Sequence, residues 1–173
     1  MNSDISNKPR PAIELQVEDW IDREGNPSAP IRLADLGEGY KVIYCFQHWC
    51  PGCHSYGFPA LKRLVESLEG RGFGFAVIQT VFEGAYTNTR ERLRENQLKY
   101  ALQIPFGHDY REHARPITMD SYRTGGTPWF LVINPEGQLV FSNFRLDAEA
   151  LITSVLANQD RTDGTGSASP SPG

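Results

Sequence analysis

The chain has 173 residues, of which 39% are hydrophobic and 22% are charged, and its formal net charge is −4. These proportions are typical of a globular protein that is large enough to bury a core. The mildly acidic balance argues against a nucleic-acid-binding surface and against a polybasic membrane anchor. No apolar run reaches the roughly 18 residues that a membrane-spanning helix needs, and the first ten residues lack the apolar segment of a signal peptide. We therefore expect a cytoplasmic protein with no nucleic-acid partner and no membrane partner.

Polar segments flank the expected domain at both ends. Residues 1–12 are polar and interrupted by prolines, which indicates a flexible leader. Residues 158–173 are rich in glycine, serine and proline. Such residues bury too little apolar surface to offset the entropy of ordering, so we expect a disordered tail there. The domain itself is expected to span residues 13–157.

The first expected elements are strands. Residues 13–17 alternate between apolar and polar, as a half-buried strand does, and residues 31–33 form a second short strand pattern after a turn. Residues 41–46 are almost continuously apolar, which is typical of a strand buried on both faces of a parallel sheet. This third strand leads directly into two cysteines, Cys50 and Cys53.

A helix and a second buried strand follow the cysteines. The helix has an apolar stripe at helical spacing, formed by Leu61, Leu64, Val65 and Leu68. Pro59 lies inside this helix and is expected to kink it. Residues 73–82 then form a buried strand. A strand–helix–strand unit of this length predicts a right-handed crossover between two parallel strands.

The rest of the chain contains two more helices and a hairpin. Residues 87–102 show the pattern of a charged surface helix. Within residues 103–125 we expect a short strand at 104–106, with the rest a loop or a broken helix. A hairpin of residues 129–133 and 138–141 follows, joined by a four-residue loop. The last helix covers residues 147–157 and is expected to be capped by Asp147. Together the elements predict an α/β fold with a mixed sheet flanked by helices.

Cys50 and Cys53 indicate thiol–disulfide exchange. Only a thiolate attacks a disulfide, so the protein must stabilise a negatively charged sulfur near neutral pH. Cys50 precedes a helix that is expected to begin at Pro51, and the free N–H groups of a helix N-terminus favour an anion. Gly52 leaves the backbone uncrowded where Cys53 closes on Cys50. We predict Cys50 as the attacking thiol and Cys53 as the resolving thiol.

The residues alone leave other interpretations of the pair open. A zinc site usually needs two further ligands at short spacing, which His48 and His54 would have to supply. The run CPGCH, which begins at Cys50, also spells the attachment motif of c-type haem. Haem attachment requires export, and neither a leader nor a second axial ligand is evident. A buried, inert pair is the fourth interpretation. The strand–turn–helix context favours redox exchange, for which we expect no metal and no cofactor.

Two neighbours of the pair have simpler roles. Cys45 lies in the buried strand, where a cysteine usually behaves as a small hydrophobic residue. Three cysteines are also too few, and an odd number, for a disulfide scaffold. Trp49 directly precedes Cys50, and we expect it to shield the thiol and to form part of the surface on which a partner docks.

Several separated motifs resemble those of the thioredoxin superfamily, and within it the TlpA- and ResA-like thiol–disulfide oxidoreductases. The resemblance spans residues 13–157 and implies a thioredoxin-like fold with an N-terminal strand extension. The residues that carry it are, in chain order, Gly37, Lys41-Val42-Ile43, Trp49-Cys50-Pro51-Gly52-Cys53, Pro59-Ala60-Leu61, Gly126-Thr127-Pro128 and Asn134-Pro135-Glu136-Gly137.

The resemblance also implies where a substrate binds. In the family, the proline that matches Pro128 is cis and lies against the active-site disulfide, and X-Pro bonds are those in which the cis form is common. The backbone of Thr127 would pair with an extended partner chain. Together with Trp49, Pro51 and Gly52, these two residues make up the expected substrate-binding set.

The chain departs from the family pattern where protons are moved. Thioredoxins place a buried acid six positions before the first cysteine, where this chain has Tyr44. TlpA- and ResA-like proteins often have a glutamate three positions after the second cysteine, where this chain has Tyr56. The helix also carries one extra residue before Pro59. The group that deprotonates Cys53 is therefore not evident. The candidates, chosen by proximity in the sequence, are His48, His54 and Tyr56.

The sequence as a whole predicts an enzyme that reduces disulfides through a cycle of Cys50 and Cys53. Its partners would be protein or small-molecule disulfides and an upstream thiol reductant. Pro51 and Gly52 offer no positive side chain to hold the thiolate, and this favours a reductase over a strong oxidant. The alternative from another class is a non-catalytic redox sensor or adaptor built on the same fold.

Overall fold

The structure is a computed structural model that describes residues 8–164 of the chain. Within that range the strands form one sheet with the order β1-β8-β7-β4-β5-β6-β2-β3. The strands are β1 (Arg10–Pro11), β2 (Asp19–Ile21), β3 (Pro27–Ser28), β4 (Lys41–Phe46), β5 (Gly74–Thr80), β6 (Phe106–Asp109), β7 (Trp129–Ile133) and β8 (Gln138–Asn143). The helical segments are the 3-10 helices η1 (Leu33–Leu36) and η3 (Glu69–Arg71), the π-helix η2 (Cys53–Gly57), and the α-helices α1 (Phe58–Leu68), α2 (Arg92–Lys99), α3 (Ile117–Tyr122) and α4 (Ala148–Gly164).

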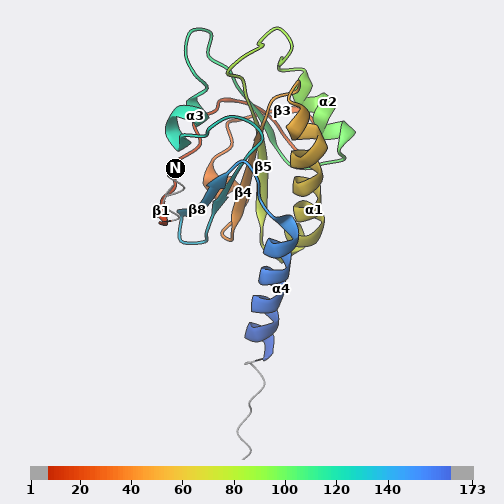
Figure 1. Cartoon of the computed structure of the whole chain (residues 1–173), viewed down its shortest axis with the longest axis vertical. Coiled ribbons are helices and arrows are strands. Elements are labelled where there is room, and N and C mark those ends of the chain that lie inside the picture. Colours follow the sequence, from red (N-terminus) through yellow and green to blue (C-terminus); the bar gives the residue numbers. More distant parts are fainter. Residues whose placement is uncertain (1–7, 165–173) are drawn as a thin grey trace, which may run out of the picture.

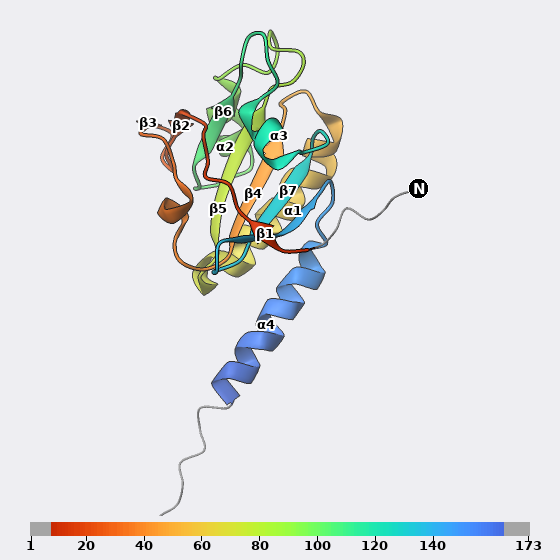
Figure 2. The ribbon, with the colours of Figure 1, turned by 90° about the vertical axis from the view of Figure 1, so that its left-hand side faces the viewer.

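The sheet is mixed and lies between helices, as predicted. β4 runs parallel to β5, and β5 runs parallel to β6, whereas β7 and β8 are antiparallel to their neighbours. Helices α1 and α4 lie on one side of the sheet and α3 lies on the other (Figures 1 and 2). The predicted crossover through α1 and the predicted hairpin of β7 and β8 are both confirmed.

β4 occupies the centre because every one of its side chains can be buried. Its six residues are all buried, and successive side chains of a strand point to opposite faces of the sheet. Val42, Tyr44 and Phe46 therefore pack in the cluster beneath α1 and α4. Ile43 and Cys45 pack in the cluster on the α3 side. The two cysteines follow the C-terminal end of this strand.

The N-terminal segment reaches the sheet differently from the prediction. Residues 13–17 form no strand, although Leu15 and Val17 are buried. The segment crosses the face of the sheet between β1 and β2 (Figure 2), so its alternation reflects burial of one side against that face. The predicted strand at 31–33 is also wrong, because 3-10 helix η1 begins at Leu33. The N-terminal extension instead contributes β1, β2 and β3.

Several other bounds also differ from the prediction. Helix α2 covers only Arg92–Lys99 of the expected 87–102, and residues 103–125 contain both β6 and α3. At the N-terminus, β1 lies within the expected leader, because Arg10 and Pro11 pair with β8. Helix α4 continues to Gly164, into the expected tail, and the N–H of Ala150 donates to the predicted cap, Asp147. The remaining tail and the first seven residues lie outside the described residues.

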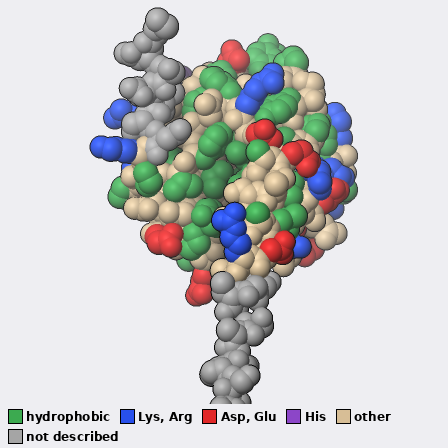
Figure 3. Space-filling model, turned by 60° about the horizontal axis from the view of Figure 1, so that its bottom comes forward, with side chains coloured by type: hydrophobic (Ala, Val, Ile, Leu, Met, Phe, Trp, Pro, Cys, Tyr) green, Lys and Arg blue, Asp and Glu red, His purple; other side chains and the backbone are tan. Residues whose placement is uncertain are grey.

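The surface carries charges of both signs. On the face drawn in Figure 3, acidic and basic side chains are interspersed, and hydrophobic side chains lie between them. Within residues 8–164, no helix combines the length and the apolar character needed to cross a membrane.

Candidate active site

Cys50 and Cys53 lie where β4 ends and the next helical segment begins, and they form a disulfide. Their Cα atoms are 5.3 Å apart, within the usual range for a disulfide. Helical geometry begins at Pro51, as predicted, and the N–H of Cys53 donates to the sulfur of Cys50 at 3.2 Å. Cys50 is half-buried and Cys53 is fully buried. Only the first sulfur is thus accessible to a partner, and a backbone donor faces it.

A π-helix follows directly and contains the extra residue that the sequence indicates. In the π-helix Cys53–Gly57, the N–H of Phe58 donates to the carbonyl of Cys53, five residues earlier. One inserted residue is the usual origin of such a turn, and π-turns are frequent at functional sites. Pro59 then lies in the first turn of α1, where its missing N–H costs little. The expected kink at Pro59 is therefore replaced by a change of helix type just before it.

Pro128 lies beside the cysteine pair although it is distant in the sequence. A Cβ atom added at Gly52 would lie 3.4 Å from Cδ of Pro128, so the proline ring lies against the backbone between the two cysteines. The Thr127–Pro128 peptide bond is cis, as the resemblance implies. Thr127 and Pro128 are both half-buried and thus accessible at the rim of the site.

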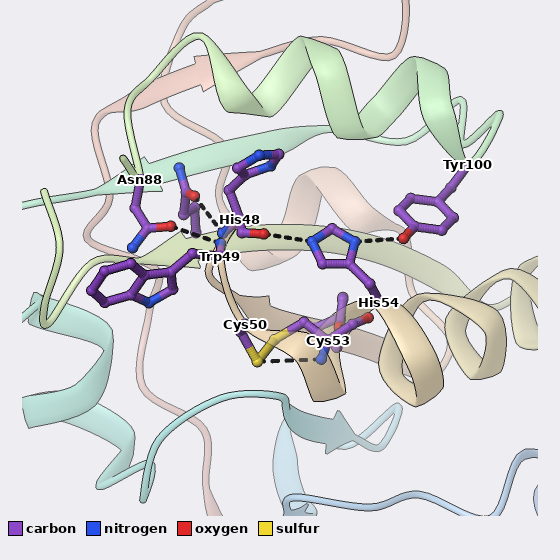
Figure 4. The surroundings of a disulfide bond; sticks show 9 residues. His48, Trp49, Cys50, Cys53, His54, Asn88 and Tyr100 are labelled. Carbon is purple, nitrogen blue, oxygen red and sulfur yellow. Dashed lines mark hydrogen bonds between the residues drawn. A yellow bond between two sulfur atoms is a disulfide. The ribbon is translucent and has the colours of Figure 1, made fainter. Parts of the chain in front are cut away.

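The two histidines turn away from the sulfurs, toward the C-terminal half of α2 (Figure 4). Nε2 of His54 donates to the carbonyl of His48 at 2.6 Å, and Nδ1 of His54 lies 2.5 Å from the hydroxyl of Tyr100. Nδ1 of His48 accepts from the side-chain amide of Asn96 at 3.1 Å. A haem ligand needs a free ring nitrogen, and neither nitrogen of His54 is free, which argues against the haem interpretation.

The third shuttle candidate, Tyr56, is engaged elsewhere as well. Its hydroxyl donates to the carbonyl of Leu146 at 2.7 Å, and the guanidinium of Arg145 lies over its ring. Within the described residues, none of the three shuttle candidates is hydrogen-bonded to either sulfur. Among the described residues, no three His, Cys, Asp or Glu side chains gather in a geometry that could hold a metal ion.

The side chain that does reach the second cysteine is Tyr44. Its hydroxyl donates to the carbonyl oxygen of Cys53 at 2.9 Å, and the tyrosine is fully buried. Burial raises the pKa of Tyr44 well above its ordinary value, and the nearby Tyr100 raises it further. From the sequence, Tyr44 is evident only as a departure from the family pattern. The indication available in the sequence was its place in a buried strand, six residues before Cys50.

Buried amide side chains hold the segment between β4 and Cys50. The Oδ1 atom of Asn88 accepts from the N–H of Trp49, and Oε1 of Gln79 accepts from the N–H of His48, each at 3.0 Å. Oε1 of Gln47 accepts from the N–H of Phe82 at 3.2 Å. All three amides are buried, and unpaired backbone donors at such depth would be costly. These amides were not predicted from the sequence, although a glutamine directly after the apolar run of β5 was a visible indication.

Trp49 is exposed at the rim of the site. Its ring is packed edge-on against Tyr86, with 6.1 Å between centroids, and Tyr86 is itself 83% exposed. A Cβ at Gly84 would lie 2.4 Å from the indole, so the loop backbone lies directly against Trp49. The loop after β5 and Trp49 thus form one aromatic wall beside Cys50.

Cys45 takes no part in this arrangement. It is a free cysteine, fully buried on the α3 side of the sheet. Burial raises the pKa of its thiol far above the ordinary value, and the charge of Asp109 raises it further. The thiol therefore stays protonated, and in the fold it fills space as a small hydrophobic side chain.

Comparisons with solved structures find the same fold in other proteins. A solved structure described as a thioredoxin-like superfamily protein is 30% identical, covers 92% of this chain and 99% of its own, and has a TM-score of 0.73. A thiol–disulfide isomerase from Corynebacterium glutamicum is 24% identical with a TM-score of 0.72, covering 85% and 94% of the two chains. The corresponding isomerase from Thermus thermophilus is 24% identical with a TM-score of 0.61, covering 86% and 94%. No family model and no curated protein matches the sequence.

Proposed function

Since the chain belongs to the thioredoxin-like superfamily, we propose that it is a thiol–disulfide oxidoreductase that reduces protein disulfides through Cys50 and Cys53. The observation that carries this proposal is the pair itself. One cysteine is accessible at the start of a helix, its partner is buried one turn later, and their backbones are spaced for a disulfide. Two solved structures of the same fold are described as thiol–disulfide isomerases, which supports the same chemistry.

The mechanism follows from the different exposure of the two sulfurs. The Cys50 thiolate attacks one sulfur of a substrate disulfide; a Cys50–substrate bond forms, and the other substrate sulfur leaves as a thiolate that takes up a proton. Cys53 loses its proton to solvent and attacks the sulfur of Cys50. The second substrate sulfur then leaves and is protonated in turn. The substrate gains two electrons and two protons, the pair becomes a disulfide, and an upstream dithiol reduces it again.

Substrate binding is proposed at the rim formed by Trp49, Pro51, Gly52, Thr127 and Pro128. No hydrogen bond involves the backbone of Thr127 within the described residues, so its N–H and C=O are available to an extended chain. A partner lying there would place its disulfide beside the accessible Cys50. We propose, on its sequence motifs, that the protein belongs to the TlpA- and ResA-like branch. We propose that it is a reductase, because Pro51 and Gly52 offer no cation to stabilise the thiolate strongly, and that it works in the cytoplasm, where thiols are usually kept reduced.

An insulin-reduction assay tests this function. With dithiothreitol as electron source, the wild-type protein should accelerate precipitation of insulin chains, and Cys50→Ser should reduce the rate to the uncatalysed background. Cys53→Ser should accumulate mixed disulfides with insulin, because attack proceeds and resolution does not. Cys45→Ala is the matched control and should keep the wild-type rate, since Cys45 is buried on the α3 side of the sheet.

Two results would contradict the proposal. If the wild-type protein formed its disulfide but never cycled with insulin, a sensing or adaptor role would replace the enzymatic one. If Cys50→Ser retained the wild-type rate, the cysteine pair would not be the active site.

A further inference from the structure

The carbonyl oxygen of Cys53 accepts two hydrogen bonds from different parts of the fold. One comes from the N–H of Phe58 and closes the π-turn; the other comes from the hydroxyl of Tyr44, at 2.9 Å, from the central strand β4. The resolving cysteine is therefore connected to the core of the sheet by a side-chain bond, in addition to its own helix.

The surroundings of Tyr44 leave its hydroxyl little choice of direction. The tyrosine ring is fully buried and packs against Phe58 and Phe130, each with 4.9 Å between ring centroids. These contacts come from α1 on one side and β7 on the other. A ring held from two sides points its hydroxyl at one place, which here is the Cys53 carbonyl.

Gly57 provides the space that this contact requires. A Cβ atom at Gly57 would lie 2.1 Å from the Tyr44 hydroxyl oxygen and 2.7 Å from the ring carbon that bears it. Gly57 is also the last residue of the π-helix. The tyrosine, the glycine and the π-turn thus fit one another, and a side chain at residue 57 would be incompatible with the bond.

We propose that Tyr44 is a positioning residue for Cys53: its hydroxyl holds the Cys53 backbone so that the second sulfur stays within reach of the first. This inference rests on the proposed function. A thiol held near its target has a higher effective concentration than a mobile one. The bond therefore accelerates the resolving step and favours the intramolecular disulfide over the open dithiol. It has no effect on the attack of Cys50 on an external disulfide.

Tyr44 acts here by donating a hydrogen bond to a carbonyl, and it is not a base for the Cys53 thiol. Its phenol is protonated at neutral pH, since a tyrosine ordinarily titrates near pH 10 and burial raises the pKa of Tyr44 further. Its oxygen is directed at a backbone oxygen and not at a sulfur. The position that carries a proton-moving acid in related thioredoxins thus serves geometry in this chain.

Tyr44→Phe tests the proposal, because it keeps the ring and removes only the hydroxyl. We expect the equilibrium constant for forming the Cys50–Cys53 disulfide, measured in glutathione redox buffers, to fall about fivefold, the effect of losing one hydrogen bond of ordinary strength. The release of thiol from a preformed Cys50–glutathione mixed disulfide should slow by a similar factor. The rate at which iodoacetamide alkylates Cys50 in the reduced protein should not change.

Tyr122→Phe is the matched control. Tyr122 is also a buried tyrosine whose hydroxyl donates to a backbone carbonyl, that of Ile13, but it lies on the opposite side of the sheet. Its removal should leave the glutathione equilibrium unchanged even if the protein becomes less stable. Should Tyr44→Phe not fold, Gly57→Ala disturbs the same contact from the other side and should lower the same equilibrium constant.

The outcomes separate this inference from the proposed function. If Tyr44→Phe has the wild-type equilibrium constant and resolution rate, the positioning role is refuted while the enzyme stands. If Tyr44→Phe and Tyr122→Phe lower the constant equally, the effect is general destabilisation and the role is again refuted. If the wild-type protein forms no disulfide in any glutathione buffer, it is the proposed function that fails.

Discussion

At the scale of single residues, two histidines are held neutral by the fold. Desolvation lowers the pKa of His48, and the charge of Arg92 lowers it further. Desolvation is likewise the first cause that lowers the pKa of His108, whose Nδ1 lies 3.3 Å from the amide nitrogen of Gln79. In both rings Nδ1 faces an amide N–H₂ group, so a proton there would remove an acceptor and place two donors opposite each other.

These two histidines predict a loss of stability in mild acid. A group whose pKa is lower in the folded state binds protons more tightly when the chain is unfolded, so the free energy of unfolding should fall as the pH drops below about 6.5. Urea denaturation at pH 7.5 and 5.5 measures this. Glu91 and Glu95 also have lowered pKa values, but their contribution is lost only below about 4.5 and does not overlap this window.

His108→Gln provides the control for that measurement. The variant keeps a polar side chain beside Gln79 but does not titrate, so its stability should change less between the two pH values. A free energy of unfolding that rises on acidification from pH 7.5 to 5.5 would contradict the interpretation.

The sequence predicts those residues of the site that belong to short motifs, but it does not predict where their neighbouring side chains point. Cys50, Cys53 and the cis Pro128 belong to short motifs of adjacent residues. Such motifs can be identified without knowing which distant residues fold against them. The directions of His48, His54 and Tyr56 cannot be identified in this way, because their partners Asn96, Tyr100 and Leu146 are 46 to 90 positions away. A titratable side chain beside a cysteine in the sequence is thus a poor guide to the group beside it in space.

At the scale of elements, the extra residue before Pro59 was noted only as a departure from the family pattern, and the structure places a π-helix at Cys53–Gly57. The sequence predicted a kink at Pro59 and did not predict the change of helix type that precedes it. The N-terminal strand at 13–17 was wrong for a physical reason. Alternating burial against the face of a sheet and pairing at its edge give the same sequence pattern, and the sequence does not contain the pairing partner.

The fit at the end of the π-helix makes Gly57 intolerant of a side chain. Gly57→Ala should lower the free energy of unfolding by about 1–3 kcal/mol, because the new methyl group overlaps the Tyr44 hydroxyl and overpacking costs this much. Gly70→Ala is the control: a Cβ at Gly70 meets nothing within 4 Å, so this variant should be as stable as the wild type or slightly more so. Equal stability of the two variants in urea denaturation would show that the glycine at 57 is not required.

At the scale of the whole molecule, a single sheet separates two hydrophobic clusters. Leu61 of α1 belongs to the cluster on one side and Leu131 of β7 to the cluster on the other, and both are fully buried. β4 contributes alternate side chains to both clusters. Because the same strands contribute side chains to both clusters, loss of packing on one side disturbs the strands that support the other side. We therefore expect the two sides to unfold together.

Substitutions on the two sides test this coupling. Leu61→Ala and Leu131→Ala should each lower the free energy of unfolding by about 2–5 kcal/mol, the cost of a cavity in a closed core. Each variant should show one transition, with the same midpoint by far-UV circular dichroism and by tryptophan fluorescence. Two separated transitions in either variant would indicate that the sides of the sheet are independent.

The buried amide of Asn88 also has a consequence for how recognition can change in this protein. Asn88 accepts from the N–H of Trp49, donates to the carbonyl of Glu83 and, through its own N–H, closes the turn onto Gly84. The side chain and the backbone N–H of this one residue therefore connect the aromatic loop to the residue before the attacking thiol. The side chain of Tyr86 forms no part of this base and is 83% exposed. Replacing Tyr86 should therefore alter the proposed docking surface and leave the backbone beside Cys50 in place.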